Sequence, residues 1–381
     1  QTLEIAHRWS DLYQKEHFSQ LDSQRLTYLF KRNTQELRMV VQELWEELGM
    51  DELSRAGARY DTGVELSADL EFEQGMNRLL ERAAEYLPDA LRAGLRSALM
   101  VLVIVMLCAM AQGMRAAGGE PVGPDVCVMA GALAITAVSA SDMSAMMGLG
   151  RSTINSMQGF SQVLLPISAA CTAATGAPAG AAARQVATVL FSNVLLTLID
   201  RLLVPLVYAY VAACTACATV GNPGLKKVAG VLKWVVTRSL TTLLVLFVTY
   251  LTVSGAIAGT TDAAALKAAK MAISTAVPVV GGIISNAAET ILVGAGLLKN
   301  TVGVFGMLAV LGICVVPFMK LGFHYLTYKF AGALAATLAD IRLAELIDGI
   351  STAFALMLGM TGASALLLLV SIISGLAGGG T

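Results

Sequence analysis

From about Leu95 to its C-terminus, the chain is a succession of apolar segments, each roughly twenty residues long. The first run extends from Leu99 to Ala111, and the last extends from Ala363 to Ser374. A bilayer core about 30 Å thick requires roughly 20 apolar residues per helix, and a soluble core of this size has no need for so many unbroken runs. We therefore expect an all-α, polytopic helical membrane protein.

The apolar stretches predict about seven full spans, give or take one or two. The expected segments are 95–112, 126–140, 152–175, 185–199, 202–220, 235–258, 265–298, 301–318 and 353–374. Segment 321–347 is amphipathic and fits a helix in the membrane interface. The basic loop at Lys226, Lys227 and Lys233 is expected in the cytoplasm. If 185–220 crosses twice, the N-terminal head then lies outside the cell membrane; if it crosses once, the head lies inside.

Residues 1–94 predict an acidic, amphipathic-helical soluble head, and 95–381 the multipass domain. Residues 1–96 hold 18 of the 27 acidic residues but only 12 of the 26 basic ones. Such a head offers no basic face to nucleic acid. We expect one helix that ends at Gly49, a linker over Gly57–Gly63, and a second helix from about Ser67. This small head would rest on a partner or on the membrane surface.

Two further interpretations concern the course of the chain. Gln1 is not preceded by Met, which suggests a mature product after removal of a signal peptide, or a trimmed chain. Pro166 and Pro205 are 39 residues apart, as are Pro278 and Pro317, which suggests repeats at 151–259 and 263–379 with broken helices. Low-complexity apolar sequence can imitate such a repeat.

Polar residues within the apolar segments are the candidates for a transport site. Asp200 and Arg201 stand between two apolar arms, and a charged pair at mid-membrane must be neutralised inside the bundle or a cavity. The alternative is a tight loop at the membrane surface. Asp340, Arg342, Glu345 and Asp348 form a charged stripe that an interfacial helix would explain.

A second group of candidates surrounds a predicted helix break. The break is formed by Pro278, Gly281 and Gly282, which free backbone groups that must face protein or water. The polar residues around it are Lys267, Lys270, Asn286 and Glu289. Glu289 is the best single ionisable candidate, although a hairpin tip or a salt bridge to a lysine would equally account for it.

The motifs of common enzymes are missing from the sequence, and we expect no enzyme, no cofactor and no metal site. There is no Walker A motif, no HExxH and no nucleophile elbow. Cys214 and Cys217 form a CxxC pair among Ala and Val, without a second pair or a nearby His. His324 is expected to be an interfacial side chain. Energy-driven transport would therefore require a separate ATPase or an ion gradient.

Several long strings carry a family resemblance. They are Pro278–Thr290, Gly296–Gly303, Lys320–Lys329 and Ala336–Gly349. In these strings the chain resembles the stage III sporulation protein AE family. The resemblance implies a multipass protein of endospore-forming bacteria, made in the mother cell with a cleavable signal peptide. It further implies a multiprotein secretion or feeding channel to the forespore. The partners would be the other stage III sporulation A subunits, including an ATPase, and a forespore membrane protein. The head would then lie between the two membranes.

Three hypotheses stay open on the sequence. The first is a subunit of that channel complex, and the second is a self-contained ion- or solute-coupled permease with its site near Pro278–Gly282. The third is a membrane scaffold that recruits ring-forming partners. Convergence of Lys267, Asn286 and Glu289 with Asp200 would favour transport, whereas exposure of each at the membrane edge would favour the scaffold.

Overall fold

A computed structural model describes residues 39–67, 70–117, 126–175, 178–276 and 281–377, with only the backbone at 115–117, 178–184, 254–276, 281–292 and 376–377. These described residues form helices and turns and no strand. After a helical segment at 39–47, the elements are α3 (Met50–Arg59), α4 (Phe72–Ala117), α5 (Val126–Ala174), α6 (Pro178–Leu198), the π-helical turn η1 (Ile199–Leu203), α7 (Val204–Val220), α8 (Pro223–Ala276), α9 (Gly281–Leu338) and α10 (Ile341–Ala377).

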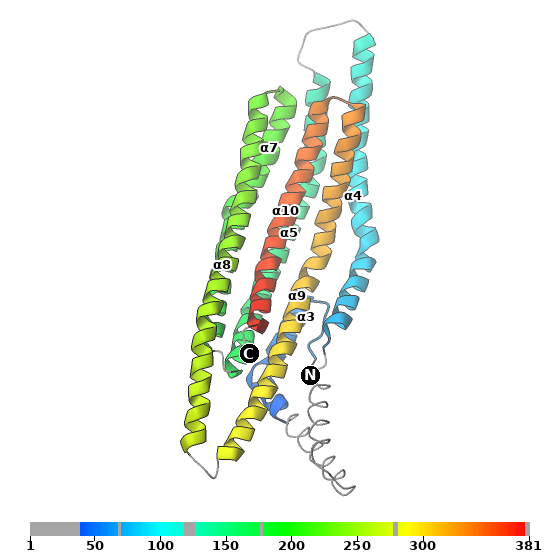
Figure 1. Cartoon of the computed structure of the whole chain (residues 1–381). Helices are drawn as coiled ribbons and strands as arrows, with labels where there is room; N and C mark the ends of the chain where they lie inside the picture. Colours follow the sequence, from blue (N-terminus) through cyan, green and yellow to red (C-terminus); the bar gives the residue numbers. More distant parts are fainter. Residues whose placement is uncertain (1–38, 68–69, 118–125, 176–177, 277–280, 378–381) are drawn as a thin grey trace, which may run out of the picture.

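Six helical stretches in the described part of the chain are long and apolar enough to cross a membrane. They run α4, α5, α6–η1–α7, α8, α9 and α10, and successive stretches point in opposite directions (Figure 1). This confirms an all-α polytopic membrane protein. The outer faces of these helices are apolar: on α4, for example, Leu99, Val103 and Leu107 are each more than half exposed. Since so large an apolar surface is unfavourable in water, lipid is its natural surrounding.

Several predicted span boundaries are wrong. Segments 126–140 and 152–175 belong to the single helix α5, and 185–199 and 202–220 belong to one continuous stretch through η1. The predicted interfacial helix at 321–347 instead comprises the end of α9 and the start of α10. Asp142, Arg151 and Asp200 lie at the expected breaks, and each has a partner on a neighbouring helix.

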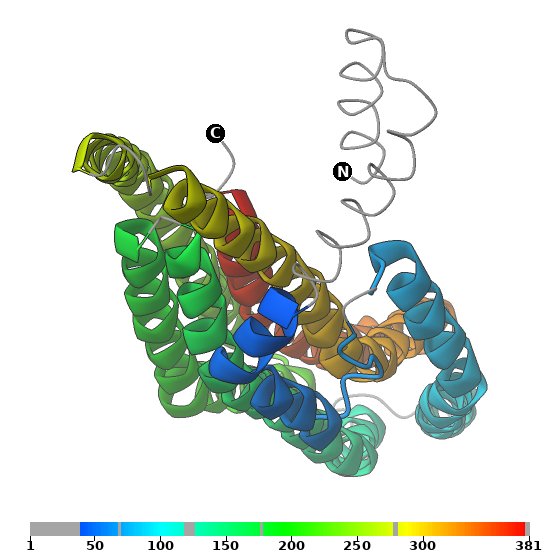
Figure 2. The ribbon, with the colours of Figure 1, turned by 90° about the horizontal axis from the view of Figure 1, so that it is seen from below.

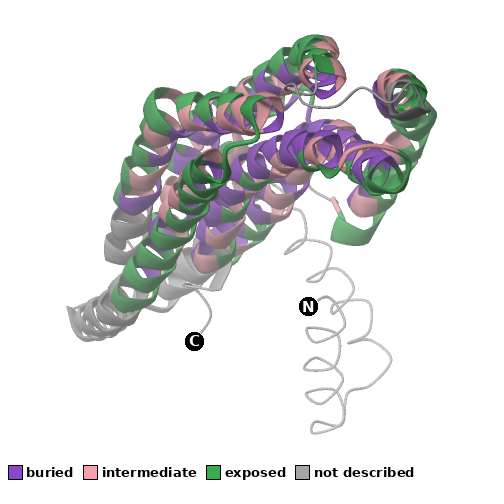
Figure 3. Ribbon diagram, turned by 90° about the horizontal axis from the view of Figure 1, so that it is seen from above, coloured by how far each residue is buried: buried purple, intermediate pink, exposed green. Residues whose placement is uncertain are grey.

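The core lies where α5, α9 and α10 pack together. Helix α4 packs on one side of α9, and α8 covers α6 and α7 on the other side of the molecule (Figure 2). Buried residues follow the inward-facing sides of the helices, as the view from above shows (Figure 3). Phe160 of α5 contacts Phe305 of α9 edge to face, with ring centroids 6.1 Å apart, and such pairs fix how two helices meet.

The described part of the head packs on the bundle itself, a support that the sequence analysis did not anticipate. Gly49 takes a left-handed conformation (φ 74°) that ends the 39–47 helix as predicted, but the predicted linker at 57–63 begins inside α3. Helix α3 lies across the lower end of the bundle (Figure 2). A Cβ on Gly312 of α9 would lie 1.7 Å from the Thr62 carbonyl oxygen, so only glycine permits this approach.

The division at residue 94 and the internal repeat stay predictions. Helix α4 runs through residue 94 without interruption. Of the four prolines that suggested a repeat, Pro166 lies inside α5, Pro317 lies inside α9, Pro205 lies in the first turn of α7, and Pro278 lies outside the described residues.

Candidate functional site

Asp200 lies inside a helix and not in a loop at the membrane surface, which corrects that alternative. It belongs to the π turn η1, roughly half-way along the stretch from Pro178 to Val220. The Val204 N–H donates to the Ile199 carbonyl, and Pro205 has no N–H to offer. The carbonyl of Asp200 is therefore left for a donor outside its own helix. π turns of this kind are frequent at functional sites.

Arg151 of α5 supplies that donor and also neutralises the Asp200 carboxylate. Its Nη2 donates to the Asp200 carbonyl at 3.2 Å, and its Nε lies 2.9 Å from Asp200 Oδ1. The sequence analysis paired Asp200 with its neighbour Arg201, whose side chain is instead exposed. Asp200 therefore has an ion-pair partner on a neighbouring helix, which the sequence analysis missed, and its place in a transport site stays a prediction.

Two uncharged pairs continue the same contact between α5 and the α6–α7 stretch. The Thr136 and Thr215 hydroxyls are 3.0 Å apart, and Gln158 Nε2 donates to Asn193 Oδ1 at 2.8 Å. Along α5, the spacings from Thr136 to Arg151 and from Arg151 to Gln158 are 15 and 7 residues. Their partners Thr215, Asp200 and Asn193 have the same spacings in the opposite chain direction. One register therefore aligns all three pairs. An intramembrane polar contact is worth about 0.6–1.7 kcal/mol, so the three together help to fix that register.

The other predicted site residues belong to the part of the α8–α9 hairpin in which the structure describes no side chains. Lys267 and Lys270 lie near the end of α8, and Gly281, Gly282, Asn286 and Glu289 lie in the first turns of α9. Their side chains fall outside the part that the structure describes, as does all of Pro278. Their convergence with Asp200 is therefore untested. In Figure 1 this hairpin forms the lower end of the molecule, whereas η1 is half-way along its own stretch.

A second buried polar group joins α5, α9 and α10. The Tyr328 hydroxyl donates to Asp142 Oδ2 at 2.9 Å and lies 3.3 Å from Ser139 Oγ. His324, one turn before Tyr328, is buried and contacts the Phe354 ring edge to face, so the prediction of an interfacial His324 is wrong. The sequence analysis overlooked Asp142 because it placed residues 141–151 between two spans. The sequence signal that could have identified Asp142 is a lone carboxylate within an apolar run.

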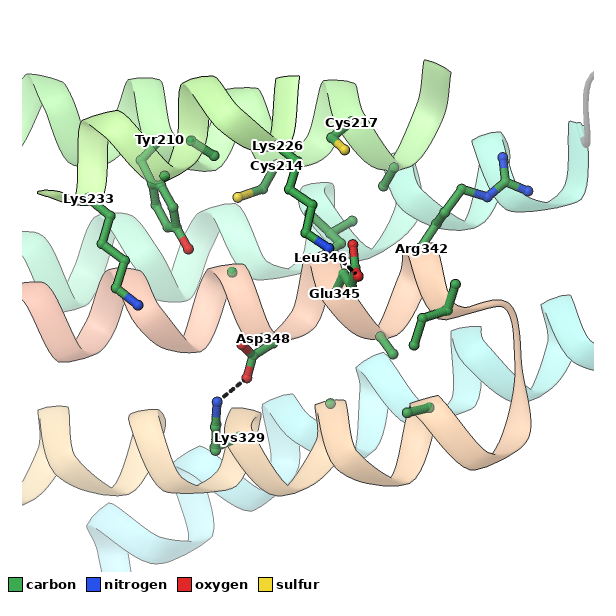
Figure 4. Close-up of a pocket in the computed structure, with 18 of the residues that line it drawn as sticks. Tyr210, Cys214, Cys217, Lys226, Lys233, Lys329, Arg342, Glu345, Leu346 and Asp348 are labelled. Atoms are coloured by element: carbon green, nitrogen blue, oxygen red, sulfur yellow. Dashed lines mark hydrogen bonds and ion pairs between the residues drawn. The ribbon is translucent and has the colours of Figure 1, made fainter. Parts of the chain in front are cut away.

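A cleft of about 600 Å³ opens near the end of the bundle where α8 and α10 begin. In Figure 4, α8 and α9 flank it and α10 lies between them, while α7 contributes Tyr210, Cys214 and Cys217. Its charged side chains are Lys226, Lys233, Lys329, Arg342, Glu345 and Asp348. Three of the four residues in the predicted charged stripe therefore line this cleft, which corrects their assignment to an interfacial helix.

Ion pairs hold the two carboxylates of this cleft. Lys226 Nζ lies 2.6 Å from Glu345 Oε1, and Lys329 pairs with Asp348 across the α9–α10 contact. Lys233 also faces the cleft (Figure 4), and no acidic partner for it occurs among the described residues. The space exists because much of its wall is glycine and alanine, such as Gly230 and Ala333.

Asp340 organises the short connection beside the cleft. Its Oδ1 accepts from the Arg342 backbone N–H at 2.9 Å and from Arg342 Nε at 3.0 Å, while Oδ2 accepts from Nη2 at 3.0 Å. Asp340 therefore caps the N-terminus of α10. The hydrogen bonds from the Arg342 side chain are the main reason why the pKa of Asp340 lies below its ordinary value. Burial acts in the opposite direction and is outweighed.

The six apolar helices and the paired polar groups between them define a polytopic helical-bundle membrane protein. A match to the family described as Stage III sporulation protein AE covers residues 64–378. The chain belongs to this sporulation protein family, which confirms the resemblance found in its sequence. No solved structure matches the chain.

A relative from Bacillus subtilis (strain 168), named Stage III sporulation protein AE, is 27% identical over 198 residues. This match covers 52% of the chain and 50% of that relative, so the chain spans about half the length of the relative it matches.

Proposed function

We propose that this protein is an integral membrane subunit of a multiprotein secretion or feeding channel that links mother cell and forespore during endospore formation. The observation that carries the proposal is the family match over residues 64–378, on a chain with six helices able to cross a membrane. The proposed partners are the other stage III sporulation A subunits, including their ATPase, and a forespore membrane protein. The ATPase would supply the nucleotide site that the sequence lacks.

The head is proposed to lie outside the mother-cell membrane, in the space that faces the forespore. Three spans separate it from the basic segment at Lys226, Lys227 and Lys233, which the positive-inside rule favours in the cytoplasm. An odd number of crossings places the head on the other side. The sequence analysis left five or four crossings open, according to whether 185–220 crosses twice or once. In the structure 185–220 is one stretch, but 126–140 and 152–175 also merge into α5, so three crossings remain.

Replacement of the native copy in a sporulating, endospore-forming host tests the channel proposal. We expect loss of the chain to abolish late forespore gene expression while early mother-cell expression continues, and a tagged chain to co-purify with the ATPase subunit. Normal late forespore expression without the chain, or a tagged functional chain that never co-purifies with the complex, would contradict the proposal.

The Arg151–Asp200 pair favours a second candidate, a permease-like polar route through this subunit, because charged groups inside a bundle commonly mark ion or solute pathways. Asp200→Asn, Lys267→Gln and Glu289→Gln test it, with assembly checked by pull-down. Loss of forespore expression with assembly intact would support a polar route. Normal activity in all three would leave a scaffold or a pore built from other residues.

A further inference from the structure

The cleft between α8 and α9 has an excess of positive charge. Four basic side chains line it against two carboxylates, and both carboxylates are already paired with lysines. Arg342 is paired with Asp340 beside the cleft. This leaves Lys233 as a charge that no described acidic residue compensates. A cation at the edge of an apolar bundle is stabilised when an anion joins it.

The cleft is also open and suited to a group larger than water. Side chains around it stay accessible: Lys226 is 65% exposed and Lys329 is 50% exposed. A Cβ on Gly230 would meet nothing within 4 Å, so the space next to Lys233 is unfilled. Helix α8 begins at Pro223, behind the neutral cap Asn222, and the positive end of its dipole adds to the field at Lys226.

We propose that this cleft binds a phosphate-bearing anion, with Lys233 supplying the uncompensated charge. Basic clefts between transmembrane helices suit anionic lipid headgroups, and each lysine near such a surface contributes about 1 kcal/mol to binding. A phospholipid phosphodiester and a soluble phosphate monoester share the chemistry that the lysines recognise. The proposal rests on the described side chains of the bundle and is independent of the channel function.

Thermal unfolding of the purified chain in a neutral detergent tests the proposal. The probes are dioleoyl phosphatidylglycerol, dioleoyl phosphatidylcholine and glycerol 3-phosphate, each titrated separately. We expect phosphatidylglycerol to raise the unfolding midpoint saturably and phosphatidylcholine to leave it unchanged. A saturable rise with glycerol 3-phosphate alone would instead identify a soluble phosphate as the source of the same anion. No shift with either phosphate probe would overturn the proposal, as would equal shifts with the two lipids.

Three variants locate the effect. Lys233→Gln should weaken binding of whichever phosphate probe raises the midpoint by about fivefold, because loss of one lysine contact removes roughly 1 kcal/mol of binding free energy. Gly230→Leu should abolish the midpoint shift by filling the cleft while keeping every charge. Lys227→Gln is the matched control, because it removes the same charge from an exposed position of α8 that does not line the cleft. If Lys233→Gln binds as the parent does, or Lys227→Gln is weakened equally, the site is not this cleft. The comparison of Lys233→Gln with Lys227→Gln tests the site even if Gly230→Leu fails to fold.

Discussion

Individual polar residues inside the bundle are paired across helices. Asp142 of α5 accepts a hydrogen bond from Tyr328 of α9, and Asp200 lies against Arg151 of α5. A charged side chain within a bilayer costs about 2.5–3.5 kcal/mol when it stands alone, so each partner offsets part of that cost. The sequence alone shows where such residues stand along the chain. It does not show which residue of another helix faces them.

The Arg151–Asp200 pair should show a measurable coupling. In a double-mutant cycle of Arg151→Gln and Asp200→Asn, we expect a coupling free energy of about 1–2 kcal/mol, because each single change leaves an unpaired group. Reversible unfolding of the detergent-solubilised chain measures it. Arg201→Gln, at the exposed neighbouring position, should change the free energy of unfolding by less than about 0.5 kcal/mol. Additive single mutants would show that the pair contributes nothing.

At the level of helices, the start of α10 depends on Asp340. Its depressed pKa means that the carboxylate stabilises the folded state above the ordinary Asp value of 3.8, and that this contribution is lost as the pH falls below 3.8 through the folded pKa. Thermal stability followed from about pH 5 to pH 3 should therefore decline less for Asp340→Asn than for the parent. Asp51→Asn is the control, because it removes a carboxylate from the first turn of another helix, α3. Identical acid profiles for parent and Asp340→Asn would contradict this role.

The contact between the head and α9 depends on a single missing side chain. Gly312→Ala would place a Cβ against the Thr62 carbonyl, so the head must shift, and we expect a loss of about 1–3 kcal/mol in unfolding free energy. Gly322→Ala on the same helix meets nothing within 4 Å and should be neutral or stabilising by up to about 1 kcal/mol. Limited proteolysis between α3 and α4 should also become faster in Gly312→Ala alone. Equal behaviour of the two variants would place the head elsewhere.

Hydropathy located the helices better than it located their ends. The apolar runs predicted every one of the six stretches, but one expected span stopped at residue 140 and another pair was divided at Asp200 and Arg201. A window of hydropathy records the cost of a polar residue and contains no information about the partner that removes this cost. The charged residues from Asp340 to Asp348 were misassigned for the same reason, because the cleft that three of them line is made by four different helices.

For the whole molecule, the orientation of the head is the property most open to test. In a variant whose six cysteines are replaced by serine or alanine, Ser54→Cys on α3 and Asn222→Cys at the other end would be labelled separately. When the chain is expressed in the cell membrane of intact, non-sporulating cells, a membrane-impermeant maleimide should label position 54 and spare position 222, because three spans separate them. Labelling of position 222 should appear only after permeabilisation. The reverse pattern would place the head in the cytoplasm.

The length of the helices carries a consequence for the shape of the protein in its membrane. Helices α8 and α9 contain 54 and 58 residues, about 80 and 90 Å of helix, whereas a bilayer core is about 30 Å thick. Much of the α8–α9 hairpin must therefore extend beyond the lipid core.

The connections between the spanning stretches bear on biosynthesis. They range from two residues, between α7 and α8, to the eight of 118–125. Under the proposed orientation, the chain would insert as three helical hairpins whose tips stay at the cytoplasmic end. The translocation machinery would then move little polar chain across the bilayer beyond the ends of the helices. Almost all of it would precede Phe72. Successful export of this single segment would then set the direction of every helix that follows.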